Sequence, residues 1–170
     1  MSDRNFGEVE ALIMQITIRL NWLVIPAIAL ATLLIGKHFT ASNMLWYSSL
    51  KLPIITPPAW FMSSMWLVIY TLTTGCALLV YNTFARNARF WFIMLLFALN
   101  AGLNSYWTYL FFTQHELTNS IWCSFVLSAT VWLLAYLIRP ESLLCSLLLL
   151  PYAIWTTYAI VLTTWIRLIQ

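Results

Sequence analysis

Charged side chains are scarce in this chain of 170 residues. Lys, Arg, Asp and Glu together make up 8% of the sequence, against about 25% in soluble domains. With 62% hydrophobic residues, a water-soluble fold could not cover its surface with so few charges. The net charge of +3 is too small and too scattered for a nucleic-acid-binding protein, and contact with anionic lipid headgroups is its expected use.

The few charges divide the chain into five charge-free stretches. They cover residues 20–36, 52–85, 90–114, 117–138 and 142–166. In a helix, about 20 apolar residues cross a hydrocarbon core about 30 Å thick. The sequence therefore predicts an all-α integral membrane protein, a bundle of five transmembrane helices whose first partner is the lipid bilayer.

Reactive side chains are equally sparse. None of the five stretches contains Asp, Glu, Lys or His, which argues against a proton relay or an ion-coupled transporter. The three cysteines (Cys76, Cys123 and Cys145) form no CxxC pair, so we expect packed thiols rather than disulfides. His38 and His115 fall in separate predicted loops, where they are expected to be solvated. We therefore expect no metal site and no required cofactor.

Prolines and charges set the predicted boundaries. We expect a lead-in over residues 1–18 and a single five-helix domain over 19–170. Pro53, Pro57 and Pro58 resist a continuous helix, so residues 40–57 are predicted to form a structured loop. The predicted helices run over residues 19–39, 58–82, 89–112, 118–138 and 143–168.

A row of small residues marks the fourth predicted helix. Ser120, Ser124 and Ser128 recur every four residues, and such small-xxx-small rows let two helices approach closely. The row predicts either packing within one chain or the seam of a dimer.

Aromatic residues are abundant, with ten Trp, eight Tyr and ten Phe. Many of them fit a belt at the lipid headgroups. Asn100, Asn104, Trp107 and Phe111, however, share one helical face. Because amides in hydrocarbon need partners, this stripe should face the bundle interior. It serves either interhelical hydrogen bonds or a ligand.

Two other predicted helices carry similar stripes. The second helix places Trp60 and Tyr70 among smaller residues, and the fifth places Trp155 above Ala159 and Leu162. Three such stripes would line an apolar cavity with a few hydrogen-bond donors. That lining suits a flat, largely hydrophobic ligand.

Three sequence blocks then point to a family. Residues 46–60 read WYSSLKLPIITPPAW and are followed by Trp66 and Tyr70, residues 103–112 read LNSYWTYLFF, and residues 150–155 read LPYAIW. In this order they resemble the WYxxLxxPxxxPPxW, LNxxWxxxFF and LPYxxW blocks of the tryptophan-rich sensory protein family. This family is also called the translocator protein or peripheral benzodiazepine receptor family (TspO/MBR).

The resemblance implies a five-helix bundle, often a homodimer, that binds porphyrins and benzodiazepine-type ligands. The expected ligand is a porphyrin, either protoporphyrin IX or heme, and nucleic acid is not an expected partner. The expected location is a bacterial cell membrane, or the mitochondrial outer membrane if the chain is eukaryotic. Some members bind cholesterol, but the tyrosine of that motif is missing near Arg167, so cholesterol stays an open question.

The resemblance also implies a binding site beneath the first loop. Trp60 and Trp155 would be facing indoles, with Asn104 and Trp107 opposite them. The full set of expected ligand-binding residues is Trp46, Leu50, Pro53, Trp60, Tyr70, Asn100, Asn104, Trp107, Phe111, Trp155, Ala159 and Leu162.

Three functions are compatible with this site. The first is a membrane receptor or sensor for porphyrins and other flat hydrophobic molecules. The second is a light-dependent porphyrin-degrading enzyme, for which Trp60 and Trp155 are the candidate catalytic residues. The third is a facilitator of porphyrin or lipid transport.

Overall fold

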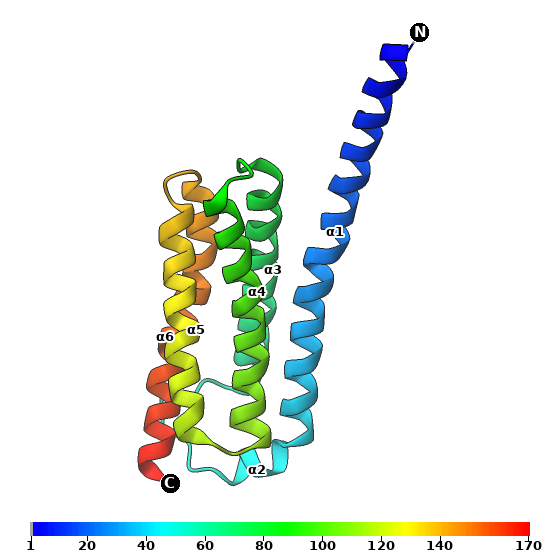
Figure 1. Ribbon diagram of the computed structural model, residues 1–170. Helices are drawn as coiled ribbons and strands as arrows, with labels where there is room; N and C mark the ends of the chain where they lie inside the picture. The colour runs from blue at the N-terminus through cyan, green and yellow to red at the C-terminus, as the bar shows by residue number, and fades with distance from the viewer. Residues whose placement is uncertain (1) are drawn as a thin grey trace.

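Seven helical segments make up the computed structural model of this protein (Figure 1). The structure describes the backbone of residues 2–170 and the side chains from Leu20 onward. The helices are α1 (Ser2–Ser42), α2 (Met44–Ser49), α3 (Ala59–Thr83), α4 (Ala88–Thr108), η1 (Tyr109–Thr113), α5 (Leu117–Ile138) and α6 (Leu143–Ile169). The predicted lead-in over residues 1–18 lies outside the residues whose side chains are described.

Five helical segments are long and apolar enough to cross a membrane. They are Leu20–Ser42, Ala59–Thr83, Ala88–Thr113, Leu117–Ile138 and Leu143–Ile169. This confirms the predicted fold class, an all-α bundle of five transmembrane helices.

Successive long helices along the chain run in opposite directions. In space they form a ring in the order α1, α4, α5, α6 and α3. The tightest pair is α5 with α6, whereas α3 and α4 touch each other little although a short turn joins them. The turns α3–α4 and α5–α6 lie at one end of the bundle, and α2, the α4–α5 turn and the C-terminus lie at the other (Figure 1).

Short polar side chains begin two of these helices. Asn87 accepts a hydrogen bond from the backbone N–H of Phe90 at the start of α4 (2.9 Å). Ser142 accepts one from the N–H of Cys145 at the start of α6 (3.2 Å). Both satisfy N–H groups that have no partner within the first helical turn.

Helix α1 departs most from its prediction. It continues to Ser42, so its spanning segment includes Lys37 and His38. The expectation that His38 lies in a loop, and that no span contains Lys or His, is therefore wrong. Lys37 bounds the first charge-free stretch, but a lysine near a helix end can extend its ammonium group to the interface and so belong to a spanning helix.

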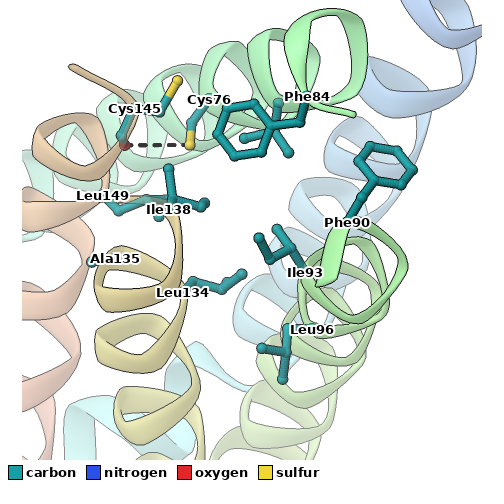
Figure 2. Packing of buried hydrophobic residues seen from close by; sticks show 11 residues of the cluster. Cys76, Phe84, Phe90, Ile93, Leu96, Leu134, Ala135, Ile138, Cys145 and Leu149 are labelled. Atoms are coloured by element: carbon teal, nitrogen blue, oxygen red, sulfur yellow. Dashed lines mark hydrogen bonds between the residues drawn. The ribbon is translucent and has the colours of Figure 1, made fainter. Parts of the chain in front are cut away.

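The end of the bundle with the α3–α4 and α5–α6 turns is solid. Its core includes Cys76, Ile93, Ile138 and Leu149, which come from four different helices (Figure 2). Arg89 closes this end by pairing with Glu141 at 3.2 Å. The larger internal space lies toward the opposite end.

The serine row of α5 packs inside the chain. Ser120, Ser124 and Ser128 are all buried, and Ser128 shares a hydrogen bond with Thr157 of α6 (3.0 Å). Of the two predicted uses, the structure shows packing within one chain, and this explains how α5 and α6 approach closely.

Candidate functional site

A cavity of about 520 Å³ opens between α1, α3, α6 and the α4–η1 segment, with α2 beside it. This volume is typical of small-molecule sites. The lining residues are Leu33, Gly36, Lys37, Thr40, Ala41, Met44, Tyr47, Ala59, Met62, Ser63, Trp66, Tyr70, Asn104, Trp107, Thr108, Phe111, Phe112, Trp155, Tyr158, Ala159, Leu162, Thr163 and Ile166. Helix α5 contributes nothing to this lining.

Aromatic rings form two of the cavity walls. Trp66 of α3 and Trp155 of α6 meet edge to face, with ring centroids 6.4 Å apart and planes at 88°. On the α4–η1 side, Trp107 stacks on Phe111 at 5.5 Å. Such rings offer large, rigid apolar faces to a flat ligand.

A chain of hydrogen bonds leads from the cavity into the bundle. The Tyr70 hydroxyl donates to Asn104 Oδ1 (2.7 Å), and Asn104 Nδ2 donates to the Tyr152 hydroxyl (3.1 Å). The Tyr152 hydroxyl donates to Asn100 Oδ1 (2.7 Å), and Asn100 Nδ2 donates to Thr130 Oγ1 (2.8 Å). The chain links α3, α4, α5 and α6, so the two asparagines do serve interhelical hydrogen bonds.

The direction of these hydrogen bonds determines what Tyr70 can offer a ligand. Its hydrogen is given to Asn104, so a ligand in the cavity meets the phenol oxygen as an acceptor. Asn104 likewise accepts from Tyr70 through its amide oxygen and donates to Tyr152 through its amide nitrogen. These residues therefore shape the wall more than they supply free donors.

A smaller cavity of about 120 Å³ lies behind this wall. Tyr70 and Asn104 line both cavities, whereas Asn100 and Tyr152 line only the smaller one. The stripe predicted from sequence is thus divided between two spaces.

The first loop is held against the bundle at two points. The Tyr158 hydroxyl, at the cavity wall, donates to the carbonyl of Ile55 (2.6 Å). Gln170 Nε2, at the end of α6, donates to the carbonyl of Lys51 (3.0 Å). Both contacts restrain the loop over the C-terminal half of α6.

Helix α2 brings two aromatic residues to the site. Tyr47 lines the cavity, and burial, together with the nearby Tyr158, raises the pKa of its phenol. Trp46 stacks on His115 with ring centroids 4.0 Å apart and planes at 12°, and meets Phe111 edge to face at 5.5 Å.

His115 lies in the α4–α5 turn and is exposed, as predicted for a solvated loop residue. In addition, its ring stacks on Trp46. Its φ of 57° is in the left-handed region, where a non-glycine residue needs surrounding contacts to hold it. The Trp46 stack supplies one such contact.

Seven of the predicted site residues line the main cavity. They are Tyr70, Asn104, Trp107, Phe111, Trp155, Ala159 and Leu162. Asn100 lines the smaller cavity, and the loop residues Trp46, Leu50 and Pro53 line neither. Whether any of them binds a ligand stays a prediction.

Trp60 is not part of the cavity. It is 71% exposed and meets Phe61 edge to face, whereas Trp66 faces Trp155. Helical periodicity explains why Trp66 and not Trp60 lines the cavity with Tyr70. Trp66 precedes Tyr70 by four residues and shares its helical face, whereas Trp60 precedes Tyr70 by ten residues and lies on another face. The same spacing in the sequence indicates Trp66.

The indole nitrogen of Trp107 is a buried donor without an acceptor in the described part of the chain. Trp107→Phe removes no hydrogen bond, so we expect the free energy of unfolding to fall by less than about 1 kcal/mol. An SDS titration in mixed micelles measures this. A loss of about 2 kcal/mol or more would show that the N–H is satisfied in the folded protein.

Comparison with known proteins agrees with the sequence blocks. The profile of the TspO/MBR family matches residues 22–168. The Tryptophan-rich protein TspO of Archaeoglobus fulgidus is 32% identical over 147 residues, which cover 82% of this chain and 92% of that protein. The uncharacterized membrane protein YtaB of Bacillus subtilis is 33% identical over 116 residues, 67% of this chain and 73% of YtaB.

A third relative, Protein CrtK of Rhodobacter capsulatus, is 30% identical over 114 residues, which cover 67% of this chain and 71% of CrtK. The family match spans all five membrane-crossing segments and every wall of the cavity. This chain is therefore an integral membrane protein that belongs to the TspO/MBR family.

Proposed function

We propose that this protein is a membrane sensor or receptor that binds a porphyrin, such as protoporphyrin IX or heme, in the main cavity. The observation that carries the proposal is the cavity of about 520 Å³ with indole and phenyl walls on opposite sides. A flat tetrapyrrole would bury its faces against these rings, and ring contact with apolar burial would supply most of the affinity.

The chemistry of the walls favours binding over catalysis. The lining offers hydroxyl, amide and indole groups and one ammonium group. The carboxylate–histidine or paired-carboxylate arrangements used for acid–base catalysis do not occur among these residues. Light-dependent porphyrin breakdown, transport and homodimer formation stay predictions, and cholesterol binding is not part of the proposal.

Exchanging the two facing indoles tests the proposal. The double variant Trp66→Leu, Trp155→Leu keeps the walls apolar but removes their aromatic faces. If each ring contributes about 0.7 kcal/mol beyond its apolar area, affinity for protoporphyrin IX should fall about tenfold. The change in porphyrin absorbance on titration into protein in nanodiscs measures the Kd.

Trp60→Leu is the matched control. It changes the same residue type on the same helix, but Trp60 lies outside the cavity. We expect it to leave the Kd unchanged. Equal losses in both variants would remove the cavity from the proposal, and no saturable binding to the unmodified protein would reject porphyrin as the ligand.

A further inference from the structure

One cationic side chain lines the main cavity, and it faces no acidic partner there. Lys37 of α1 is in the lining, which contains neither Asp nor Glu. Within the residues whose side chains are described, the sole salt bridge joins Arg89 and Glu141 at the far end of the bundle. Lys37 is thus a cation in a spanning helix without an ion-pair partner among those residues.

Local packing fixes the level of Lys37 in the cavity. It follows Gly36, where a Cβ atom would lie 3.7 Å from Thr108 Oγ1, so α1 and α4 are in close contact at this point. Lys37 therefore lies at about the level of Trp107 and Thr108, five residues before the end of α1. Lys37 is exposed, which is consistent with an ammonium group at the cavity opening.

The surrounding charges reinforce this cation. At the same end of the bundle, the described residues include Lys51 and Arg167 against the single acid Glu116. An opening with excess positive charge and low-dielectric walls attracts anions and raises their local concentration.

Two hydroxyl groups of the cavity wall do not compete with Lys37 as donors. The hydroxyl hydrogen of Tyr158 is given to the Ile55 carbonyl, and that of Tyr70 to Asn104. The ammonium group has three N–H donors, which suits a carboxylate oxygen.

We propose that Lys37 makes this cavity selective for ligands that carry a carboxylate. The flat apolar part of the ligand lies between the aromatic walls, and its carboxylate pairs with Lys37 at the opening. This inference rests on the proposed porphyrin-binding function and adds to it the charge of the ligand.

Protoporphyrin IX and its dimethyl ester test the inference, because they share one ring and differ in the two carboxylates. Both are titrated into protein in nanodiscs of zwitterionic lipid. An ion pair near a surface strengthens binding up to about fivefold, so the unmodified protein should bind the diacid about fivefold more tightly than the ester. Lys37→Met should remove this preference by weakening the diacid alone, and Lys37→Arg should keep it.

Lys51→Met is the control for the general field, because Lys51 is at the same end of the bundle but outside the lining. It should leave the preference for the diacid in place. Equal binding of diacid and ester to the unmodified protein would overturn the selectivity while leaving porphyrin binding intact. Binding of neither would overturn the proposed function itself.

Two further outcomes count against Lys37. If Lys51→Met weakens the diacid as much as Lys37→Met does, the preference arises from the general field and not from a direct pair. If Lys37 instead pairs with lipid headgroups, Lys37→Met will change the affinity of neither porphyrin. Repeating the titrations in nanodiscs with anionic lipid tests for such pairing, because anionic headgroups would compete with the porphyrin carboxylate for the ammonium group of Lys37.

Discussion

Replacing Leu149 with alanine should lower the free energy of unfolding by about 2–3 kcal/mol. Leu149 is fully buried in the solid end of the bundle, in the same cluster as Ile138 and Cys145 (Figure 2). In a membrane the separated helices contact lipid tails, which are as apolar as leucine, so the transfer of the side chain contributes little. The lost dispersion contacts and the cavity left behind then supply most of the loss.

Leu147→Ala separates this packing effect from the general effect of a shorter side chain. Leu147 lies on the same helix but is 49% exposed, so its replacement should change the free energy of unfolding by less than about 0.5 kcal/mol. SDS titration in mixed micelles, followed by circular dichroism, compares the two variants. Equal losses would mean that the cluster around Leu149 is no better packed than the outer surface of α6.

The lengths of the apolar stretches were sufficient to predict the architecture. A helix in hydrocarbon must satisfy its own backbone, so the length of an apolar stretch predicts a crossing directly. The starts of α3 to α6 fall within one residue of their predictions, because prolines, charges and N-cap residues mark them locally. The end of α1 has no such mark, and the helix continues past its predicted end at residue 39 to Ser42.

The site was predictable where one helix decides which way a side chain points. Asn104, Trp107 and Phe111 share a face of the α4–η1 segment, and all three line the cavity. Asn100 belongs to the same stripe but is separated from the main cavity, because Tyr152 of α6 bonds to both asparagines. The sequence of α4 alone does not indicate that Tyr152 of α6 lies between these two asparagines.

Residues whose roles depend on two distant segments were the ones missed. Trp46 and His115 are far apart in the sequence, and their stack forms only when α2 folds over the α4–α5 turn. For the second indole, the stripe on the second predicted helix and the family resemblance both pointed to Trp60, whereas the four-residue spacing to Tyr70 indicates Trp66, which faces Trp155. Lys37 lines the site because α1 packs closely on α4.

The hydroxyl of Tyr152 joins the two asparagines of α4, and its removal should be the second costly change. Tyr152→Phe leaves Asn100 Oδ1 without its donor and Asn104 Nδ2 without its acceptor, both in a buried setting. Unpaired buried groups cost about 1–3 kcal/mol each. Hydrogen bonds in membrane bundles average only about 0.6 kcal/mol, because the separated helices find other partners in the bilayer. For the two bonds together we expect a loss of about 1.5–2 kcal/mol.

Tyr136→Phe provides the comparison, since Tyr136 of α5 is 74% exposed and the loss of its hydroxyl should cost under about 0.5 kcal/mol. SDS titration measures both variants. The double variant Tyr152→Phe, Asn100→Leu then tests the cause. Leucine removes the acceptor left unpaired, so it should recover part of the stability lost in Tyr152→Phe. If Asn100→Leu instead lowers the stability further, Asn100 stabilises the bundle through its bond to Thr130. The hydrogen bonds then act as separate pairs and not as one connected network.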